Sequence, residues 1–158
     1  MSRRIVRGAG AWALTGAALL ALTLAAGCPA KFVSDYDPQL DKQLTEFQKK
    51  VETFINKMAV YRGKPEGRYE NNTDFYQKEV PVEIKLLLFR ANLQDKNQET
   101  ITMIELLQNN LKIMEELHKD HGYLSERDLK QVQRGINTSF RSLMLFEQEK
   151  RTGRGEAK

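Results

Sequence analysis

Cysteine and histidine are nearly missing from this sequence, and their scarcity removes several kinds of site. Cys28 is the only cysteine among 158 residues, so an internal disulfide is impossible. The two histidines, His118 and His121, lie on the same predicted helical turn. A di-iron bundle needs a Glu-x-x-His pair on each of two helices and two further carboxylates. The chain therefore has too few histidines for such a centre.

Signals of other chemistries are scarce as well. No serine follows the strand–turn–helix pattern of a hydrolase nucleophile, and no strand pattern competes with the helical ones. After Cys28 the basic residues alternate with acidic ones, without a basic block, so we expect no nucleic-acid partner. The sequence predicts a protein that is not an enzyme and that uses no cofactor.

The first 27 residues have the layout of an export signal. Three arginines between residues 3 and 7 come without an acidic residue, and an apolar run extends from Ala11 to Ala26. A retained transmembrane anchor is the alternative. A span needs about 20 apolar residues, however, and this run is shorter and rich in alanine and glycine. We therefore predict a signal peptide, residues 1–27, that is removed on export.

The end of this segment, Leu24-Ala25-Ala26-Gly27-Cys28, resembles the lipobox of bacterial lipoproteins. Small residues precede a cysteine whose thiol accepts a diacylglycerol, and only cysteine offers that nucleophile. Ala25 departs from the commonest pattern, which has leucine there. An ordinary secretory signal with an incidental cysteine is the alternative, but a lone thiol directly after small residues is better explained as a lipid-attachment site. We predict that Cys28 carries the lipid.

Removal of the signal changes the charge balance. The full chain has 25 basic and 21 acidic residues, a net charge of +4. Without the three signal arginines the balance is 25 − 3 = 22 basic against 21 acidic residues, a net charge of +1. The basic character therefore belongs largely to the signal, and it gives no support to a nucleic-acid partner.

Residues 28–36 are predicted to be a short tether, at most ~30 Å long when extended. A helix then begins at Asp37-Pro38, an N-cap followed by a proline that tolerates the first helical position, and ends at Gly63. Its apolar residues recur at gaps of four and three, which predicts a buried face. These residues are Leu40, Leu44, Phe47, Val51, Phe54, Met58 and Tyr61.

The second segment is predicted to extend from Tyr69 to Leu93, with Pro81 inside it. Proline removes a backbone hydrogen bond, so either the helix is kinked at Pro81, which we favour, or a new helix begins there. Arg90 is expected to be a snorkelling surface residue rather than a buried ion partner. The predicted buried stripe is Tyr76, Val80, Ile84, Leu87 and Ala91, widened by Leu86, Leu88 and Phe89.

A third helix is predicted from Asn97 to Gly122, and a fourth begins at Ser125-Glu126-Arg127-Asp128, which imitates a capping box. Gly135 inside the fourth either marks a close helix–helix approach or is merely tolerated. Their stripes are Ile101, Ile104, Leu107, Leu111, Met114 and Leu117, and then Leu129, Val132, Ile136, Phe140, Leu143 and Phe146. Residues 37–151 are thus predicted to be an all-α, antiparallel up-down-up-down four-helix bundle, followed by a disordered tail, residues 152–158.

Two candidate sites stand out. Glu115, His118 and His121 lie on neighbouring turns, and His118 and His121 share a helix face that could hold a single metal or small ligand. The alternative is two histidines that complement the helix dipole. The segment 68–76 gathers aromatic and amide side chains around a helix start, which is typical either of an interaction surface or of a loop stapled to the bundle.

The chain from Cys28 to Lys150 resembles a loosely defined group of small, uncharacterised all-helical lipoproteins of Gram-negative bacteria. The resemblance rests on Cys28, Phe32-x-x-x-Tyr36-Asp37, Phe47 and Phe54, Asn71 with Phe75-Tyr76, Glu115-x-x-His118 and Phe140. It implies a lipid-anchored protein facing the periplasm. Pro29, in place of an inner-membrane retention signal, implies the outer membrane. We expect a binding module for another envelope protein or the cell wall; a metal or small-ligand carrier is the alternative.

Overall fold

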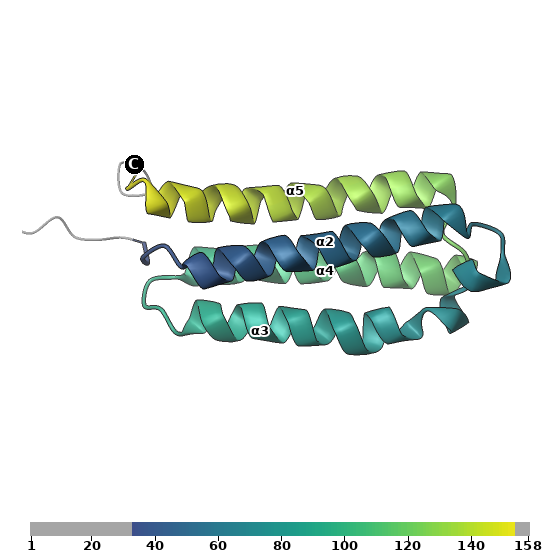
Figure 1. Ribbon diagram of the computed structural model, residues 1–158, viewed down its shortest axis with the longest axis horizontal. Helices are drawn as coiled ribbons and strands as arrows, with labels where there is room; N and C mark the ends of the chain where they lie inside the picture. Colours follow the sequence, from purple (N-terminus) through teal and green to yellow (C-terminus); the bar gives the residue numbers. More distant parts are fainter. Residues whose placement is uncertain (1–32, 154–158) are drawn as a thin grey trace, which may run out of the picture. The chain divides into compact units, whose positions relative to one another are not determined.

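The computed structural model describes residues 33–153, which contain four α-helices and no strand (Figure 1). The helices are α2, Pro38–Val60; α3, Val80–Asn92; α4, Gln98–His121; and α5, Glu126–Arg151. The all-helical prediction is confirmed for these residues. The predicted signal peptide, Cys28, the first part of the tether and residues 154–158 lie outside them. Among the described residues no helix is long and apolar enough to cross a membrane.

Helix α2 begins as the sequence predicts. The Asp37 carboxylate accepts hydrogen bonds from the backbone N–H groups of Gln39, at 2.9 Å, and Leu40, at 3.3 Å. Pro38 occupies the first turn, where its missing N–H costs nothing. The predicted face is buried except for Tyr61, which is partly exposed, and Ile55 joins it. The buried residues of α2 are Leu40, Leu44, Phe47, Val51, Phe54, Ile55 and Met58.

The connection between α2 and α3 departs from the prediction. The helix does not start at Tyr69, because Pro65–Gly67 and Tyr69–Asn71 are two separate 3-10 turns. A π-helical turn, Phe75–Glu79, then leads into α3, with the Val80 N–H bonded to the Phe75 carbonyl. A proline ring clashes with the carbonyl four residues back, and a π turn widens the helix. The disturbance predicted as a kink at Pro81 thus takes the form of a π turn just before it.

Helices α4 and α5 meet at a tight, well-capped corner. Gly122 ends α4 in the left-handed region, with φ 70°, which favours glycine. Ser125 and Asp128 form the predicted capping box at the start of α5: each side chain bonds the other residue's backbone N–H. Further along α5, a Cβ added to Gly135 would stand 3.4 Å from the Asn110 side chain. That distance is ordinary van der Waals contact, so a side chain would fit and the helix packing does not require glycine at this position.

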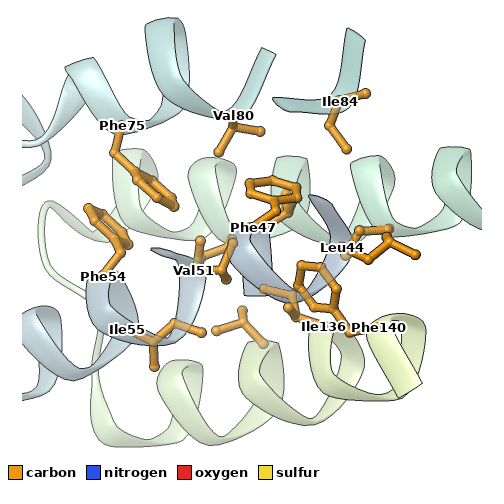
Figure 2. Close-up of a cluster of buried hydrophobic side chains, with 14 of the residues drawn as sticks. Leu44, Phe47, Val51, Phe54, Ile55, Phe75, Val80, Ile84, Ile136 and Phe140 are labelled. Carbon is orange, nitrogen blue, oxygen red and sulfur yellow. The ribbon is translucent and has the colours of Figure 1, made fainter. Parts of the chain in front are cut away.

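The core lies where the inner faces of the helices meet (Figure 2). Phe47 of α2 packs edge-on against Phe140 of α5, with ring centroids 5.6 Å apart. Phe54 stacks on Phe75 at the π turn, at 3.7 Å between centroids. Such aromatic pairs add about 0.5–1.5 kcal/mol beyond the burial of their surface. Aromatic contacts therefore join α2 to the neighbours on both of its sides.

The outer face of α3 contradicts the sequence prediction. Leu86 and Phe89 were expected to widen the buried stripe, but they are exposed, and only Leu88 packs against the core. Val80, Ile84, Leu87 and Ala91 already fill the side of α3 that faces the bundle. Residues half a turn away must therefore point outward. Helix α3 thus has one buried apolar face and one exposed apolar face.

Candidate functional site

His118 lies fully buried in the last turn of α4, with both ring nitrogens engaged. Nε2 lies 2.9 Å from the Gly67 carbonyl oxygen, and Nδ1 lies 2.9 Å from the Tyr76 hydroxyl. A carbonyl can only accept, so Nε2 carries the proton and donates to Gly67, while the Tyr76 hydroxyl donates to Nδ1. Burial lowers the pKa of His118, despite the opposing effects of the Gly67 carbonyl and Glu70. His118 is therefore a neutral, buried residue whose hydrogen bonds link α4 to Gly67 and Tyr76.

Two tyrosines enclose this histidine. The rings of Tyr69 and Tyr76 have centroids 5.6 and 5.8 Å from that of His118. The Tyr69 hydroxyl donates to the Glu115 carboxylate at 2.9 Å. Burial raises the pKa of Tyr76, while burial and the bond to Glu115 raise the pKa of Tyr69. Both phenols are therefore neutral hydrogen-bond donors. We call Tyr69, Tyr76, Gly67, Glu115 and His118 together the His118 cluster.

Gly67 cannot be replaced by a larger residue, because no side chain fits at this position of the cluster. A Cβ at Gly67 would stand 2.2 Å from the Tyr61 carbonyl oxygen, well inside contact distance. The close approach aims the Gly67 carbonyl at His118. Two residues later, the Tyr69 N–H donates to the Gly122 carbonyl at 3.0 Å. The connection between α2 and α3 is thus fastened to the end of α4 by backbone groups.

His121 has a different environment from His118. Its side chain is half exposed, and its Nδ1 lies 3.0 Å from the Asp128 carboxylate. Burial alone would raise the pKa of Asp128, but hydrogen bonds from Ser125 and His121 outweigh it and lower the pKa. His121 therefore supports the capping box of α5.

The three residues of the candidate ligand site do not converge. Glu115 accepts from Tyr69, His118 is closed in by Gly67 and Tyr76, and His121 turns to Asp128. Within residues 33–153, no group of three histidine, cysteine, aspartate or glutamate side chains could hold a metal ion. The alternative prediction, that both histidines complement the helix dipole, does not hold for His118, which is buried and neutral.

The segment 68–76 is largely a loop stapled to the bundle. The Asn72 amide donates to the carbonyls of Glu66, at 2.8 Å, and Arg68, at 2.7 Å, while its oxygen accepts from Lys57 at 2.9 Å. Part of the segment still reaches the surface. The Arg68 side chain is exposed, and its Nε donates to the Tyr123 hydroxyl at 2.6 Å. Residues 61–76 and 121–128 together make up what we call the far end of the bundle.

A groove of about 470 Å³ lies between α3 and α4 beside the His118 cluster. Tyr76, Val80 and Pro81 contribute apolar surface, and Glu105 and Glu115 contribute carboxylates. Its volume falls in the range of small-molecule sites, about 300–1,000 Å³. The His118 ring nitrogens are both occupied, however, so His118 cannot exchange a proton with an occupant of the groove. The groove therefore offers apolar and carboxylate surface to an occupant.

The opposite end, which we call the base, holds a second polar cluster that the sequence did not reveal. Lys150 and Glu147 form a 2.6 Å ion pair whose side chains are 1 % and 0 % exposed. Lys150 also donates to the side-chain oxygens of Asn97 and Thr100, both at 2.7 Å. Glu147 lies four residues after the buried Leu143, at the core position that apolar spacing assigned to Phe146. A helical register counted from Leu143 would have found it.

The chain enters the bundle at this base. The Ser34 hydroxyl donates to Asn97 at 2.8 Å, and the Ser34 N–H donates to the Lys96 carbonyl at 3.2 Å. Asp37 pairs with Arg90 at 2.6 Å between Oδ2 and Nε. The expectation that Arg90 is a snorkelling residue was therefore wrong: it is an ion partner. Burial would raise the pKa of Asp37, but bonds from Arg90, Gln39 and Leu40 lower it.

No protein-family model, no curated protein and no solved structure matches this chain. The resemblance to small helical lipoproteins therefore stays a prediction.

Proposed function

We propose that this protein is a lipid-anchored component of the bacterial envelope. Its export signal, residues 1–27, would be removed, Cys28 would carry the lipid, and the bundle would face the periplasm, with the outer membrane favoured by Pro29. The domain would act as a non-catalytic module that binds another envelope protein or the cell-wall layer. The contacts support an antiparallel up-down-up-down bundle, because Asp37 lies beside Arg90 while Phe54 lies beside Phe75.

One observation carries this proposal: the chain enters the bundle at a fastened base. Ser34 and Asp37 are held by partners on α3 and in the α3–α4 connection, and only five residues, 29–33, separate Cys28 from Ser34 in the sequence. The six residue steps from Cys28 to Ser34 reach about 20 Å when extended. A lipid on Cys28 would keep the base close to the bilayer, and the far end, at the other end of the helices, would be the part of the domain most distant from the anchor.

The far end has the composition of a binding surface. Arg62, Lys64 and Arg68 are exposed there, and the Arg68 guanidinium lies 5.5 Å from the centroid of the Tyr123 ring. Arginine and tyrosine are enriched in protein–protein interfaces, where a few such residues supply most of the binding energy. The far end is therefore where we expect a partner to bind.

Three measurements test this proposal, the first two on protein made in its native cells. Intact-mass analysis should show Cys28 as an acylated first residue; an unacylated Cys28, or residues 1–27 still attached, would contradict the anchor. A photo-crosslinker at the exposed Lys64 should capture a discrete partner. The matched control places it at Glu99, exposed at the base. Equal capture from both positions would argue against a binding far end, and substrate turnover by the purified protein would argue against a non-catalytic role.

A further inference from the structure

The outer face of α3 carries a continuous apolar stripe. Val82, Leu86, Phe89 and Leu93 are 55 %, 46 %, 66 % and 65 % exposed. Their spacing of four, three and four residues puts them on one side of the helix, as in the seam of a coiled coil. Single exposed apolar residues are ordinary on protein surfaces, but a row of four large ones on one face marks an interaction site.

The bundle itself does not need these residues. The opposite side of α3 supplies Val80, Ile84, Leu87 and Ala91 to the core, and all four are buried. Between the two faces, Glu83 pairs with Lys50 and Arg90 pairs with Asp37, so the polar contacts of α3 go to α2. Within residues 33–153 no element covers the stripe, as its exposure shows.

We propose that the stripe Val82, Leu86, Phe89 and Leu93 rests on the membrane surface. This inference builds on the proposed lipid anchor but adds a second contact, made by the protein itself. Helix α3 would lie along the bilayer with its outer side chains in the headgroup region, as amphipathic interfacial helices do. Lys85, exposed between Val82 and Phe89 in the helix, would meet anionic headgroups.

The position of the chain entry supports a bilayer as the occupant. Arg90, whose side chain holds Asp37, lies one residue from Phe89, and Asn97, which holds Ser34, lies four residues beyond Leu93. The fastened entry is thus next to the end of the stripe. A lipid on Cys28, six residues before Ser34, could be at most about 20 Å from this entry. Tethering on this scale raises the effective concentration of membrane at the stripe without any further contact.

The size of the stripe argues against a second copy of this chain. Four side chains exposed by about half offer on the order of 400 Å² of apolar surface. A stable protein–protein interface of standard size needs about 800 Å² from each partner. A lipid surface has no such threshold, because the apolar side chains need only enter the boundary between headgroups and acyl chains, and the anchor supplies the remaining binding free energy.

Tryptophan fluorescence can test the proposal cleanly. Trp12 is the only tryptophan of the chain and lies in the predicted signal, so the mature protein would contain none. Phe89→Trp would place a single fluorophore in the stripe. Leu145→Trp is the matched control: Leu145 is 51 % exposed on α5, which Figure 1 shows across the bundle from α3. Each full-length variant would be made in cells and reconstituted in vesicles of phosphatidylethanolamine and phosphatidylglycerol, with bromine on a fraction of the acyl chains.

We expect the emission of the Phe89→Trp variant to shift to shorter wavelength and to be strongly quenched by the brominated lipid. The Leu145→Trp variant should keep the emission of a water-exposed indole. Equal quenching of both variants, or quenching of neither, would overturn the proposal. A blue shift in Phe89→Trp without quenching by bromine would also overturn it, because the indole would then be covered by protein, either a second copy or another partner.

The proposed lipid anchor and the proposed membrane contact of the stripe can be refuted separately. If Cys28 is unacylated, intact-mass analysis shows this directly, and the proposed function falls. The same variants, added as unacylated protein to the same vesicles, then decide the stripe alone: selective quenching of Phe89→Trp supports membrane contact, and its absence refutes it. In the Phe89→Trp background, Leu86→Glu with Leu93→Glu adds two negative charges beside the fluorophore; it should abolish the quenching while leaving the buried face of α3 unchanged.

Discussion

Buried polar clusters stabilise both ends of the bundle, but one cluster joins neutral groups by hydrogen bonds and the other contains an ion pair. At the far end the buried part of the His118 cluster is neutral: the Tyr76 hydroxyl bonds to the His118 imidazole, and the imidazole bonds to the Gly67 carbonyl. At the base, Lys150 and Glu147 are an ion pair almost without solvent contact. Removing one partner costs about 1–3 kcal/mol in a neutral network, but about 3–5 kcal/mol in a buried ion pair, where it leaves a buried charge without its counter-ion. The base should therefore be the more vulnerable end.

The largest effect is expected from breaking the charged cluster on one side only. Glu147→Ala leaves the Lys150 ammonium buried without its counter-ion, and this should lower the free energy of unfolding by about 3–5 kcal/mol. Urea denaturation followed by circular dichroism would measure the change. The double variant Glu147→Leu with Lys150→Met removes both charges and should recover most of the loss. A double variant as unstable as the single one would show that charge is not the cause.

A smaller loss is expected when the neutral cluster is broken. His118→Leu leaves the Tyr76 hydroxyl and the Gly67 carbonyl buried without partners, which should lower the free energy of unfolding by about 2–3 kcal/mol. Tyr76→Phe serves as the second arm of a double-mutant cycle, since it removes the hydroxyl that His118 accepts from. Additive effects of the two substitutions would mean that their hydrogen bond contributes nothing.

The corner between α4 and α5 should respond more weakly. Ser125→Ala removes the side chain that caps the Asp128 N–H, and a lost N-cap costs about 1 kcal/mol. The same denaturation experiment would measure this change. Glu126→Ala is a suitable control, because Glu126 is exposed and its ion pairs with Lys130 and Arg62 lie at the surface. If both substitutions had the same effect, the capping box would not be the source of stability.

Mild acid should produce the smallest change, and it should act on the far end first. Burial lowers the pKa of His118 in the folded protein. The neutral form is thus favoured by folding, so this contribution is complete above about pH 6.5, the ordinary histidine pKa, and is lost as the pH falls below it. The lowered pKa of Asp37 has the same sign, but its contribution is lost only below about pH 3.9.

Thermal unfolding between about pH 7.5 and 5 would detect the histidine contribution. His118→Leu should flatten the pH dependence in this range, while Asp37→Asn should leave it intact and remove part of the loss at lower pH. A wild-type melting temperature that stays constant down to about pH 5 would contradict the neutral, buried state of His118.

Local patterns in the sequence predicted a good part of this molecule. The spacing of Leu40, Leu44 and Phe47 identified the buried face of α2, and Ser125 with Asp128 identified the start of α5, because both signals lie within one or two helical turns. The sequence could not give the partners of Arg90 and His118, which lie 53 and 51 residues away at Asp37 and Gly67. Such pairings depend on how the helices pack.

The prediction that Leu86 and Phe89 are buried was wrong for a related reason. An apolar residue contributes equally to a hydropathy pattern whether it faces a core or a surface, so Leu86 and Phe89 looked like an extension of the buried face. Which of two apolar faces turns inward is decided by the neighbouring helices. Here the inner positions are taken by Ile84 and Leu87, while Glu83 and Arg90, beside the buried face, pair with Lys50 and Asp37.

The fastened chain entry also has a mechanical consequence. Any force that reaches the domain through its N-terminal chain acts first on Ser34 and Asp37, before it reaches the apolar core. Asp37 caps α2 and forms an ion pair with Arg90 of α3, while Ser34 donates a hydrogen bond to Asn97 at the start of α4. A pulling force on the N-terminal chain is therefore distributed over three helices at once. It does not act on the first turn of α2 alone.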